Sequence, residues 1–267
     1  MTNAQKVIKY LAIAFAFSII VSIIYGLLVA FNLVGKISKN NNNNIDYYRK
    51  IELNKEDNEM DINLKITNLY IKKGNEYCIE TNNRYIKYNE ENKKLIIKEE
   101  ANINLNKEYY LTLTIPNSIN YENIKLDTGA GVVKIDSLNG NTANLDFGAG
   151  KVIIEDINIK NDIELDAGAG SLEIKKGTIN NLDLDMGVGK VIINSTLTGN
   201  NMIDAGVGKL DINLQNKKEN YTFKVSKGIG SIKLNNDEIK DNETVGNGIN
   251  IIDINGGIGS INILTTE

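Results

Sequence analysis

Hydrophobic and polar residues alternate along most of the chain after residue 125, and the alternation changes phase at regular intervals. In the stretch IELDAGAGSLEI, residues 163–174, apolar side chains occupy odd positions from Ile163 to Ala169 and even positions at Leu172 and Ile174. Strict alternation is typical of a β-strand with one buried face. A strand that turns a corner while keeping its apolar side inward must shift parity by one residue. The pattern therefore predicts two short strands joined at a corner.

This pattern recurs seven times. Each copy begins with an apolar residue, which is followed by a polar residue (Asp in most copies), then by any residue, then by Gly-x-Gly and a second alternating stretch. The first glycines of successive copies are separated by 19, 20, 19, 19, 22 and 29 residues. A strand–helix–strand crossover needs about 30 residues or more, so the repeat is too short to contain a helix. The sequence therefore predicts an all-β fold. We expect a parallel β-solenoid of 19–20-residue rungs, in which equivalent strands of neighbouring rungs pair.

The glycines of the repeated Gly-x-Gly are predicted to form the structural corners. Glycine adopts backbone conformations that other residues avoid, and it has no side chain to obstruct a tight bend. These corner residues are Gly129, Gly131, Gly148, Gly150, Gly168, Gly170, Gly187, Gly189, Gly206, Gly208, Gly228, Gly230, Gly257 and Gly259.

An aspartate stands two positions before the first glycine in each of the first five copies. Its parity places it on the outer surface, where stacked rungs would align these side chains about 4.8 Å apart. One hypothesis is a cation-binding ladder, because Ca²⁺ favours carboxylate oxygens. The other is that each Asp accepts backbone hydrogen bonds at its corner. Ser226 and Asn255 replace it in later copies, which favours the second hypothesis. The aspartates are Asp127, Asp146, Asp166, Asp185 and Asp204.

The N-terminal region has a different pattern, because residues 10–35 contain no charged side chain. Twenty-six residues in a helix would extend about 39 Å, more than the roughly 30 Å hydrocarbon core of a membrane. We therefore predict a single-pass transmembrane anchor at 10–35, with residues 1–9 as a cytoplasmic tail. A cleaved signal peptide is the alternative. The Asn-rich residues 36–46 are predicted to be a polar tether.

Residues 47–125 alternate without corner glycines. We interpret them as degenerate rungs that cap the solenoid of residues 126–267, with 235–248 as a surface insertion. Cys78 alternates with apolar neighbours and is predicted to be a small buried hydrophobe. Eight tyrosines here either pack as strand residues or line a surface for a partner or glycan. They are Tyr47, Tyr48, Tyr70, Tyr77, Tyr85, Tyr88, Tyr109 and Tyr110.

Composition excludes several classes of function. The chain has no His and a single Cys, which excludes His-based catalysis, His-containing zinc sites and an intrachain disulfide. Beyond residue 44 it carries 26 basic and 34 acidic side chains, which argues against nucleic-acid binding. Carboxylates alone could serve a polysaccharide-active enzyme, but Phe147 is predicted to be core and other aromatics are few. We predict no enzymatic activity, no cofactor and no small-molecule substrate.

The strand LTLTIP, the following NIKLDTGAGVVKI and the iterated Asp-x-Gly-x-Gly rungs resemble a bacterial putative-adhesin family of β-strand repeats, domain-of-unknown-function family 4097. The resemblance covers roughly residues 50–263. It implies a membrane-tethered protein of the cell envelope, and says more about architecture and location than about activity.

Together these features predict a single-pass protein of the bacterial cell membrane whose C-terminal solenoid is extracytoplasmic. Its expected role is a non-enzymatic interaction scaffold, adhesion-like or envelope-sensing, with a protein partner. One alternative is self-assembly, because the last repeat ends in INILTTE and would leave its strand edge exposed. A second alternative is an enzyme acting on envelope polysaccharides.

Overall fold

A computed structural model describes residues 47–54, 57–100 and 107–266 of the chain. The predicted tail, anchor and tether, residues 1–9, 10–35 and 36–46, lie outside this part. All of the described strands belong to one compact unit, Asp46–Ile103 with Tyr109–Glu267. No helix in the described ranges is long and apolar enough to cross a membrane.

The described residues form one 20-stranded sheet, and their only helical element is the 3₁₀ turn Lys218–Asn220. The predicted all-β class is therefore confirmed. The strands are β1 Arg49–Glu52, β2 Glu59–Leu64, β3 Asn68–Gly74, β4 Cys78–Thr81, β5 Ile86–Glu91, β6 Lys94–Glu99, β7 Tyr110–Pro116, β8 Tyr121–Ile135, β9 Leu138–Ile154, β10 Ile157–Ile159, β11 Ile163–Ile174, β12 Gly177–Asn180, β13 Leu182–Thr198, β14 Asn200–Lys217, β15 Tyr221–Ser226, β16 Ile229–Leu234, β17 Asp237–Glu238, β18 Glu243–Gly246, β19 Asn250–Asn255 and β20 Ile258–Thr266.

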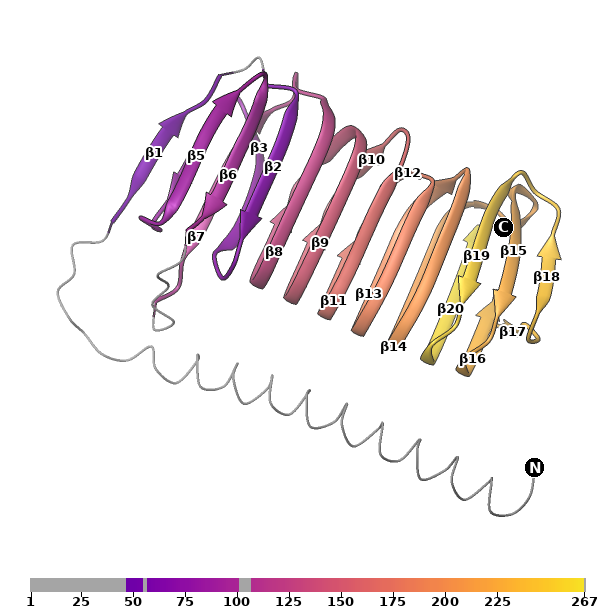
Figure 1. Cartoon of the computed structure of the whole chain (residues 1–267). Coiled ribbons are helices and arrows are strands. Elements are labelled where there is room, and N and C mark those ends of the chain that lie inside the picture. Colours follow the sequence, from indigo (N-terminus) through magenta and orange to yellow (C-terminus); the bar gives the residue numbers. More distant parts are fainter. Residues whose placement is uncertain (1–46, 55–56, 101–106, 267) are drawn as a thin grey trace. The chain divides into compact units, whose positions relative to one another are not determined.

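The middle of the unit is a ladder of long parallel strands, β8, β9, β11, β13 and β14, which lie side by side in Figure 1. Equivalent residues of the repeat are direct partners, so that Leu165 lies opposite Leu145 on one side and Leu184 on the other. This arrangement is consistent with the predicted β-solenoid. In these five strands the corner lies inside one continuous bent strand, whereas the sequence pattern suggested two separate strands.

The predicted change of parity is confirmed in β11. Ile163 and Leu165 are each 1% exposed before the corner, and Leu172 and Ile174 are 3% and 0% exposed after it. Both halves of the strand therefore contribute to one hydrophobic core. Cys78 is buried, as predicted, and Phe147 is 4% exposed within this core.

Both glycines of the corner are required, for different reasons. The second glycine of each pair has a positive φ, for example +146° at Gly150, a conformation that side chains of L-residues rarely adopt. At the first glycine φ is unremarkable, but a Cβ on Gly148 would overlap the carbonyl oxygen of Gly129 in the next rung. The corner glycines thus allow the backbones of neighbouring rungs to approach closely at the bend.

At the C-terminal end, the order of the rungs in space differs from their order in the sequence. The rung of β19 and β20 pairs in parallel with β14 on one side and with β15 and β16 on the other (Figure 1). Residues 261–266 of the segment INILTTE belong to β20, so this strand lies inside the ladder. The expectation that this strand forms an exposed edge is wrong, and self-assembly through it loses its basis. The outer edge is partly covered by the short antiparallel strands β17 and β18.

The N-terminal end has a similar exchange of order. Strand β2 lies between β8 and β6, and β3 lies between β8 and β7, all in parallel. Beyond them β5, β4 and β1 pair in antiparallel fashion. Strand β5 carries exposed charged residues such as Lys87 and Glu91, which oppose pairing with another strand edge.

The turn between β2 and β3 lacks the glycines of the other corners and is held by a buried carboxylate. Glu99, 3% exposed, accepts hydrogen bonds from the backbone N–H groups of Lys65, Ile66 and Thr67 at 2.7, 3.0 and 3.3 Å. It also accepts bonds from the Thr67 hydroxyl at 2.8 Å and from Nδ2 of Asn83 at 2.7 Å. One side chain thus takes the place of the backbone acceptors that a further rung would supply.

Candidate functional site

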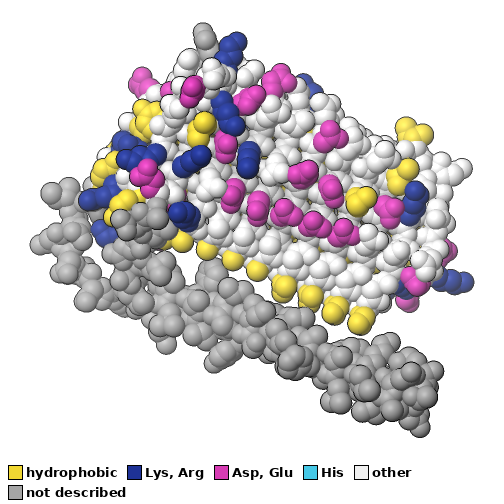
Figure 2. Space-filling view, in the orientation of Figure 1, with side chains coloured by type: hydrophobic (Ala, Val, Ile, Leu, Met, Phe, Trp, Pro, Cys, Tyr) yellow, Lys and Arg dark blue, Asp and Glu magenta, His cyan; other side chains and the backbone are white. Residues whose placement is uncertain are grey.

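The five repeat aspartates form one straight row on the outside of the ladder. Register pairs each aspartate with the next along the row, and all five side chains are exposed or half-buried. Figure 2 shows this line of acidic side chains across the middle rungs. We call Asp127, Asp146, Asp166, Asp185 and Asp204 the acidic row.

The carboxylates of the acidic row accept hydrogen bonds from side chains at its two ends. Nδ2 of Asn63 donates to Asp127 at 2.6 Å and Nδ2 of Asn255 donates to Asp204 at 2.6 Å. Within the described residues, no backbone N–H donates to any of the five carboxylates, so the corner-acceptor hypothesis is wrong. The physical reason is that the bent strand stays in the ladder through the corner, where N–H groups bond to carbonyls of the neighbouring rung. Ala130 N–H, for example, donates to Lys65 O at 2.7 Å.

The stacked carboxylates repel one another. Partial burial raises the pKa of Asp166, and the neighbouring charges of Asp146 and Asp185 raise it further. Asp183, two positions before Asp185 on the same surface, also has a raised pKa through burial and the nearby Asp185 and Asp204. The row therefore opposes folding at neutral pH, and the fold does not use its central members as hydrogen-bond acceptors.

Replacing Asp166 with asparagine should consequently stabilise the protein. A carboxyl whose pKa is raised by folding weakens the folded state above that pKa and has no such effect when protonated. We expect a gain of a few tenths of a kcal/mol at pH 7 and low salt, since exposed charges interact weakly. The gain should vanish near pH 3 and in high salt. Melting curves at both pH values test this, with Asp237→Asn as the exposed control, and an equal gain at pH 3 would contradict the electrostatic cause.

The cation-ladder hypothesis remains a prediction. Among the described residues, no group of three or more acidic or Cys side chains converges closely enough to hold a metal ion. The hypothesis requires a rise in melting temperature in millimolar calcium that is lost when Asp146 and Asp166 are both replaced by asparagine. A calcium response that survives this double substitution would place the cation elsewhere.

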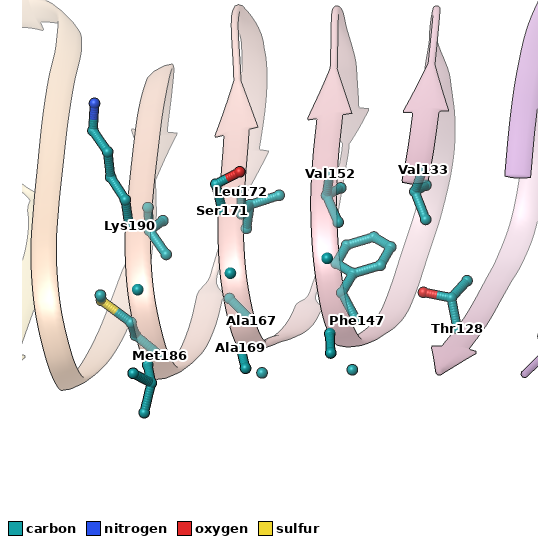
Figure 3. Close-up of a pocket in the computed structure, with 18 of the residues that line it drawn as sticks. Thr128, Val133, Phe147, Val152, Ala167, Ala169, Ser171, Leu172, Met186 and Lys190 are labelled. Atoms are coloured by element: carbon teal, nitrogen blue, oxygen red, sulfur yellow. The ribbon is translucent and has the colours of Figure 1, made fainter. Parts of the chain in front are cut away.

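An apolar row follows the corners next to the acidic row and consists of the middle residues of the Gly-x-Gly repeats, Ala130, Ala149, Ala169, Val188, Val207, Ile229 and Ile258. Register aligns the middle residue of every Gly-x-Gly, and the exposed fraction reaches 40% at Ile258 and 58% at Ile229. Figure 2 shows these hydrophobic side chains along the lower edge, and in Figure 3 Ala169 points away from the interior while Ala167 faces it. The alternation had suggested that Ala169 faces inward. The bend turns this residue outward, so the inward series ends at Ala167.

A small, partly open pocket lies at the corners of the middle rungs. Its volume is about 20 Å³, and Phe147, Ala167 and Met186 are among the residues that line it (Figure 3). Small Ala167 lies between the larger Phe147 and Met186 on adjacent rungs. A void of this size holds about one water molecule.

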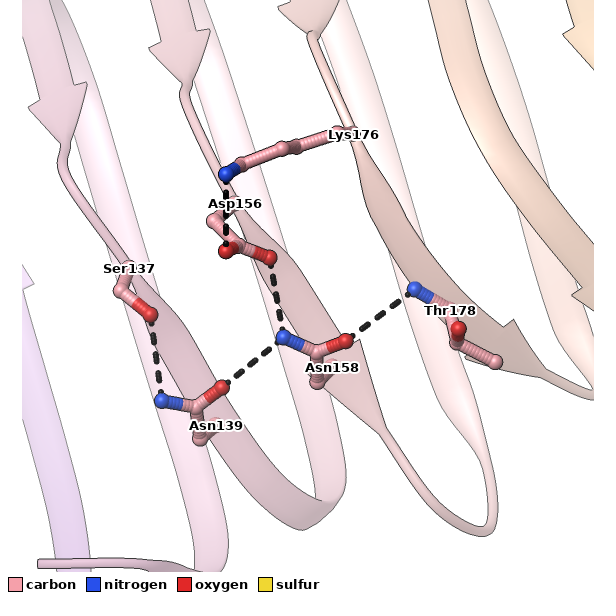
Figure 4. Close-up of polar contacts among 6 residues, drawn as sticks. All are labelled: Ser137, Asn139, Asp156, Asn158, Lys176 and Thr178. Atoms are coloured by element: carbon pink, nitrogen blue, oxygen red, sulfur yellow. Dashed lines mark hydrogen bonds and ion pairs between the residues drawn. The ribbon is translucent and has the colours of Figure 1, made fainter. Parts of the chain in front are cut away.

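A third surface is formed by β10, β12 and the neighbouring ends of β9 and β13. Here polar side chains bond from rung to rung, as Figure 4 shows. Asn158 Nδ2 donates to Asn139 Oδ1 at 3.0 Å, and Thr178 N–H donates to Asn158 Oδ1 at 3.3 Å. The side chains of Asn139 and Asn158 thus form hydrogen bonds between neighbouring rungs and contribute to the stability of the ladder.

The N-terminal tyrosines divide between packing and exposure. Tyr77 and Tyr109 are buried, and the Tyr77 hydroxyl lies 3.1 Å from that of Tyr121. Tyr48 is 57% exposed and Tyr88 is 40% exposed. The two arginines of the chain stack here, Arg84 at 5.7 Å from the Tyr47 ring centre and Arg49 at 5.9 Å from that of Tyr88. This end therefore presents the aromatic and Arg side chains that are enriched in protein interfaces.

The parallel pairing of equivalent rungs and the row of glycine corners define a class of β-repeat protein. The family model of Toastrack DUF4097 matches residues 31–263, and the chain belongs to this family. The expected resemblance is thereby confirmed. No curated protein matches the chain.

Solved structures with similarity to the chain include three bacterial proteins. A putative cell adhesion protein from Clostridium sporogenes is 19% identical, with a TM-score of 0.37, covering 82% of this chain and 99% of its own. A putative adhesin from Bacteroides fragilis is 12% identical, with a TM-score of 0.34 and coverages of 81% and 95%. One from Parabacteroides distasonis is also 12% identical, with a TM-score of 0.29 and coverages of 82% and 96%.

Proposed function

We propose that the protein is a non-enzymatic interaction scaffold of the bacterial cell envelope. In this proposal residues 10–35 anchor it in the cell membrane, residues 36–46 act as a tether, and the β-solenoid lies outside the cytoplasm. The observation that carries the proposal is the ladder itself. It presents long rows of aligned side chains on its surfaces, while the pockets found at the corners of the middle and C-terminal rungs are each of about 20 Å³. Such a molecule is suited to binding partners on a surface, in an adhesion-like or envelope-sensing role.

The binding surface can be located by photocrosslinking in living cells. A photoreactive amino acid would replace Asp166 in the acidic row, Thr178 on the third surface, or Tyr48 at the N-terminal end, all of which are exposed. An interaction scaffold should give a distinct crosslinked protein from one of these positions and little from the others. Equal, unspecific crosslinking at all three positions would contradict a dedicated binding surface.

The proposed location has a separate test based on the single cysteine. Cys78 is buried, and burial raises the pKa of its thiol, so it should react slowly with maleimides. A membrane-impermeant maleimide should therefore label Lys240→Cys, at an exposed position, in intact cells. Asn3→Cys, in the predicted cytoplasmic tail, is the matched control and should be labelled only after lysis. The reverse pattern would place the solenoid in the cytoplasm.

A further inference from the structure

A pair of acidic side chains, one buried and one half-buried, lies at the N-terminal end, away from the acidic row. Asp57, just before β2, is only 3% exposed. Its side chain meets the carboxyl group of Glu90, which is on the edge strand β5. The two residues are also joined through Asn54, whose N–H donates to Glu90 Oε1 at 2.5 Å and whose carbonyl accepts from Asp57 N–H at 3.4 Å. No motif in the sequence indicates this pair, because its members lie far apart along the chain.

One oxygen of the pair has no donor. Asp57 Oδ2 is buried and has no hydrogen-bond partner among the described residues. Two ionised carboxylates offer only acceptors, so they repel each other in a medium of low polarity. A single proton held between them converts one into a donor and supplies the missing bond. Among the described residues, Asp57 Oδ2 can therefore gain a hydrogen bond only if one of the two carboxyl groups is protonated.

No basic side chain offsets this requirement among the described residues around the pair. The groups that face Asp57 are Glu90 from β5, Tyr77 from the β3–β4 connection and Tyr121 from β8. Burial raises the pKa of both tyrosines, so their hydroxyls remain neutral. Burial, with Glu90 adding to it, raises the pKa of Asp57 to about 6. The proton is thus taken up in a range of pH near neutrality.

The strand held by this pair is at the edge of the ladder. Among the described strands β5 pairs only with β6, and β1 pairs only with β4. Arg49 Nη2 donates to Ile86 O at 2.7 Å and so links β1 to β5. We propose that Asp57 and Glu90 form a proton-dependent clasp, which holds β5 against the start of β2 when protonated and loosens it when ionised.

The direction of the effect follows from the raised pKa. Stability from the clasp is fully present below the ordinary Asp pKa of about 3.8 and is lost as the pH rises through about 6. With a pKa of about 3.8 when the clasp is open and about 6 when it is closed, the equilibrium constant for opening of β5 should be about tenfold larger at pH 7.5 than at pH 5. The N-terminal end should therefore be closed in mild acid and looser at neutral pH.

Hydrogen exchange of the full chain tests the clasp. After correction for intrinsic rates, peptides covering β5 should exchange about tenfold more readily at pH 7.5 than at pH 5, while those in β11 and β13 should not change. Asp57→Asn and Glu90→Gln each supply a permanent N–H donor, so either variant should keep β5 protected at both pH values. If Asp57→Asn fails to fold, Glu90→Gln decides the matter.

The matched control is Asp146→Asn, which removes an exposed carboxylate of the acidic row and should leave the pH response of β5 intact. Two outcomes would overturn the clasp. One is equal protection of β5 in the unmodified chain at pH 5 and 7.5. The other is a tenfold change that persists in both Asp57→Asn and Glu90→Gln.

Discussion

Replacing Gly150 with alanine is expected to destabilise the solenoid by about 2–6 kcal/mol. The new residue would have to hold a φ of +146°, which L-residues avoid, at about 1–3 kcal/mol. Its Cβ would also overlap the carbonyl oxygen of Gly131 in the adjacent rung. Relief of that overlap requires two paired backbones to move apart, which adds about 1–3 kcal/mol more, as is typical of overpacking. Urea unfolding followed by far-UV circular dichroism measures the effect.

The neighbouring Ala149 provides the matched control. It stands between the same two glycines, and its half-buried methyl group belongs to the apolar row. Ala149→Gly should cost no more than about 1 kcal/mol, through added freedom of the unfolded chain. Similar losses for Gly150→Ala and Ala149→Gly would show that the corner does not depend on the backbone conformation of Gly150.

The second large effect is expected at Glu99. Its removal in Glu99→Ala leaves the backbone N–H groups of the turn, one of them buried, together with the buried Thr67 hydroxyl and Asn83 amide, without this acceptor. Each buried group that loses its partner costs about 1–3 kcal/mol, and some will recruit water. We expect a loss of about 3–5 kcal/mol, with the opening of the β2–β3 turn visible as faster hydrogen exchange at Lys65 and Ile66.

Glu99→Gln should have a smaller effect, about 1–2 kcal/mol, because the amide oxygen still accepts while its NH₂ faces donors. Glu100, the exposed neighbour, serves as the control, and Glu100→Gln should change stability by less than about 0.5 kcal/mol. Unchanged melting of Glu99→Ala would mean that the turn is held by its chain connections alone.

These two sites solve the same problem by different means. The repeated corners satisfy their backbone groups through contact with an identical corner in the next rung, which only glycine permits at Gly150. Among the described residues the β2–β3 turn has no such corner on its outer side, and the carboxylate of Glu99 supplies acceptors there. Together with the antiparallel strands β1, β4 and β5, this closes one end of the ladder. A closed end favours a scaffold that binds through its faces over one that grows by stacking.

Much of the fold could be predicted from the sequence because the repeat is local and periodic. The 19–20-residue spacing aligned Asp146 with Asp166 and Asp185, and the shift of parity placed Leu165 and Leu172 in one core. Both follow from a period of two along a strand and from identical rungs pairing in register. The outward direction of the acidic row followed from the same parity. The prediction that these aspartates accept hydrogen bonds at the corners was wrong. The strands stay paired through the bend, so the corner N–H groups bond to carbonyls of the neighbouring rung and not to Asp166.

Sequence alone thus determined the all-β class, the length of the rung, the corner glycines and the inward side chains on both sides of the corner, although not at Ala169 within it. Tertiary structure alone decided that β20 lies between β14 and β16, and that Asp57 meets Glu90. The physical reason is the likeness of the rungs. Any rung with the pattern of β16 or β20 forms much the same backbone pairs with its neighbour, so local pattern does not choose between them. Their order is set by the chain connections and by the antiparallel strands at the two ends, which act only once the whole ladder has assembled.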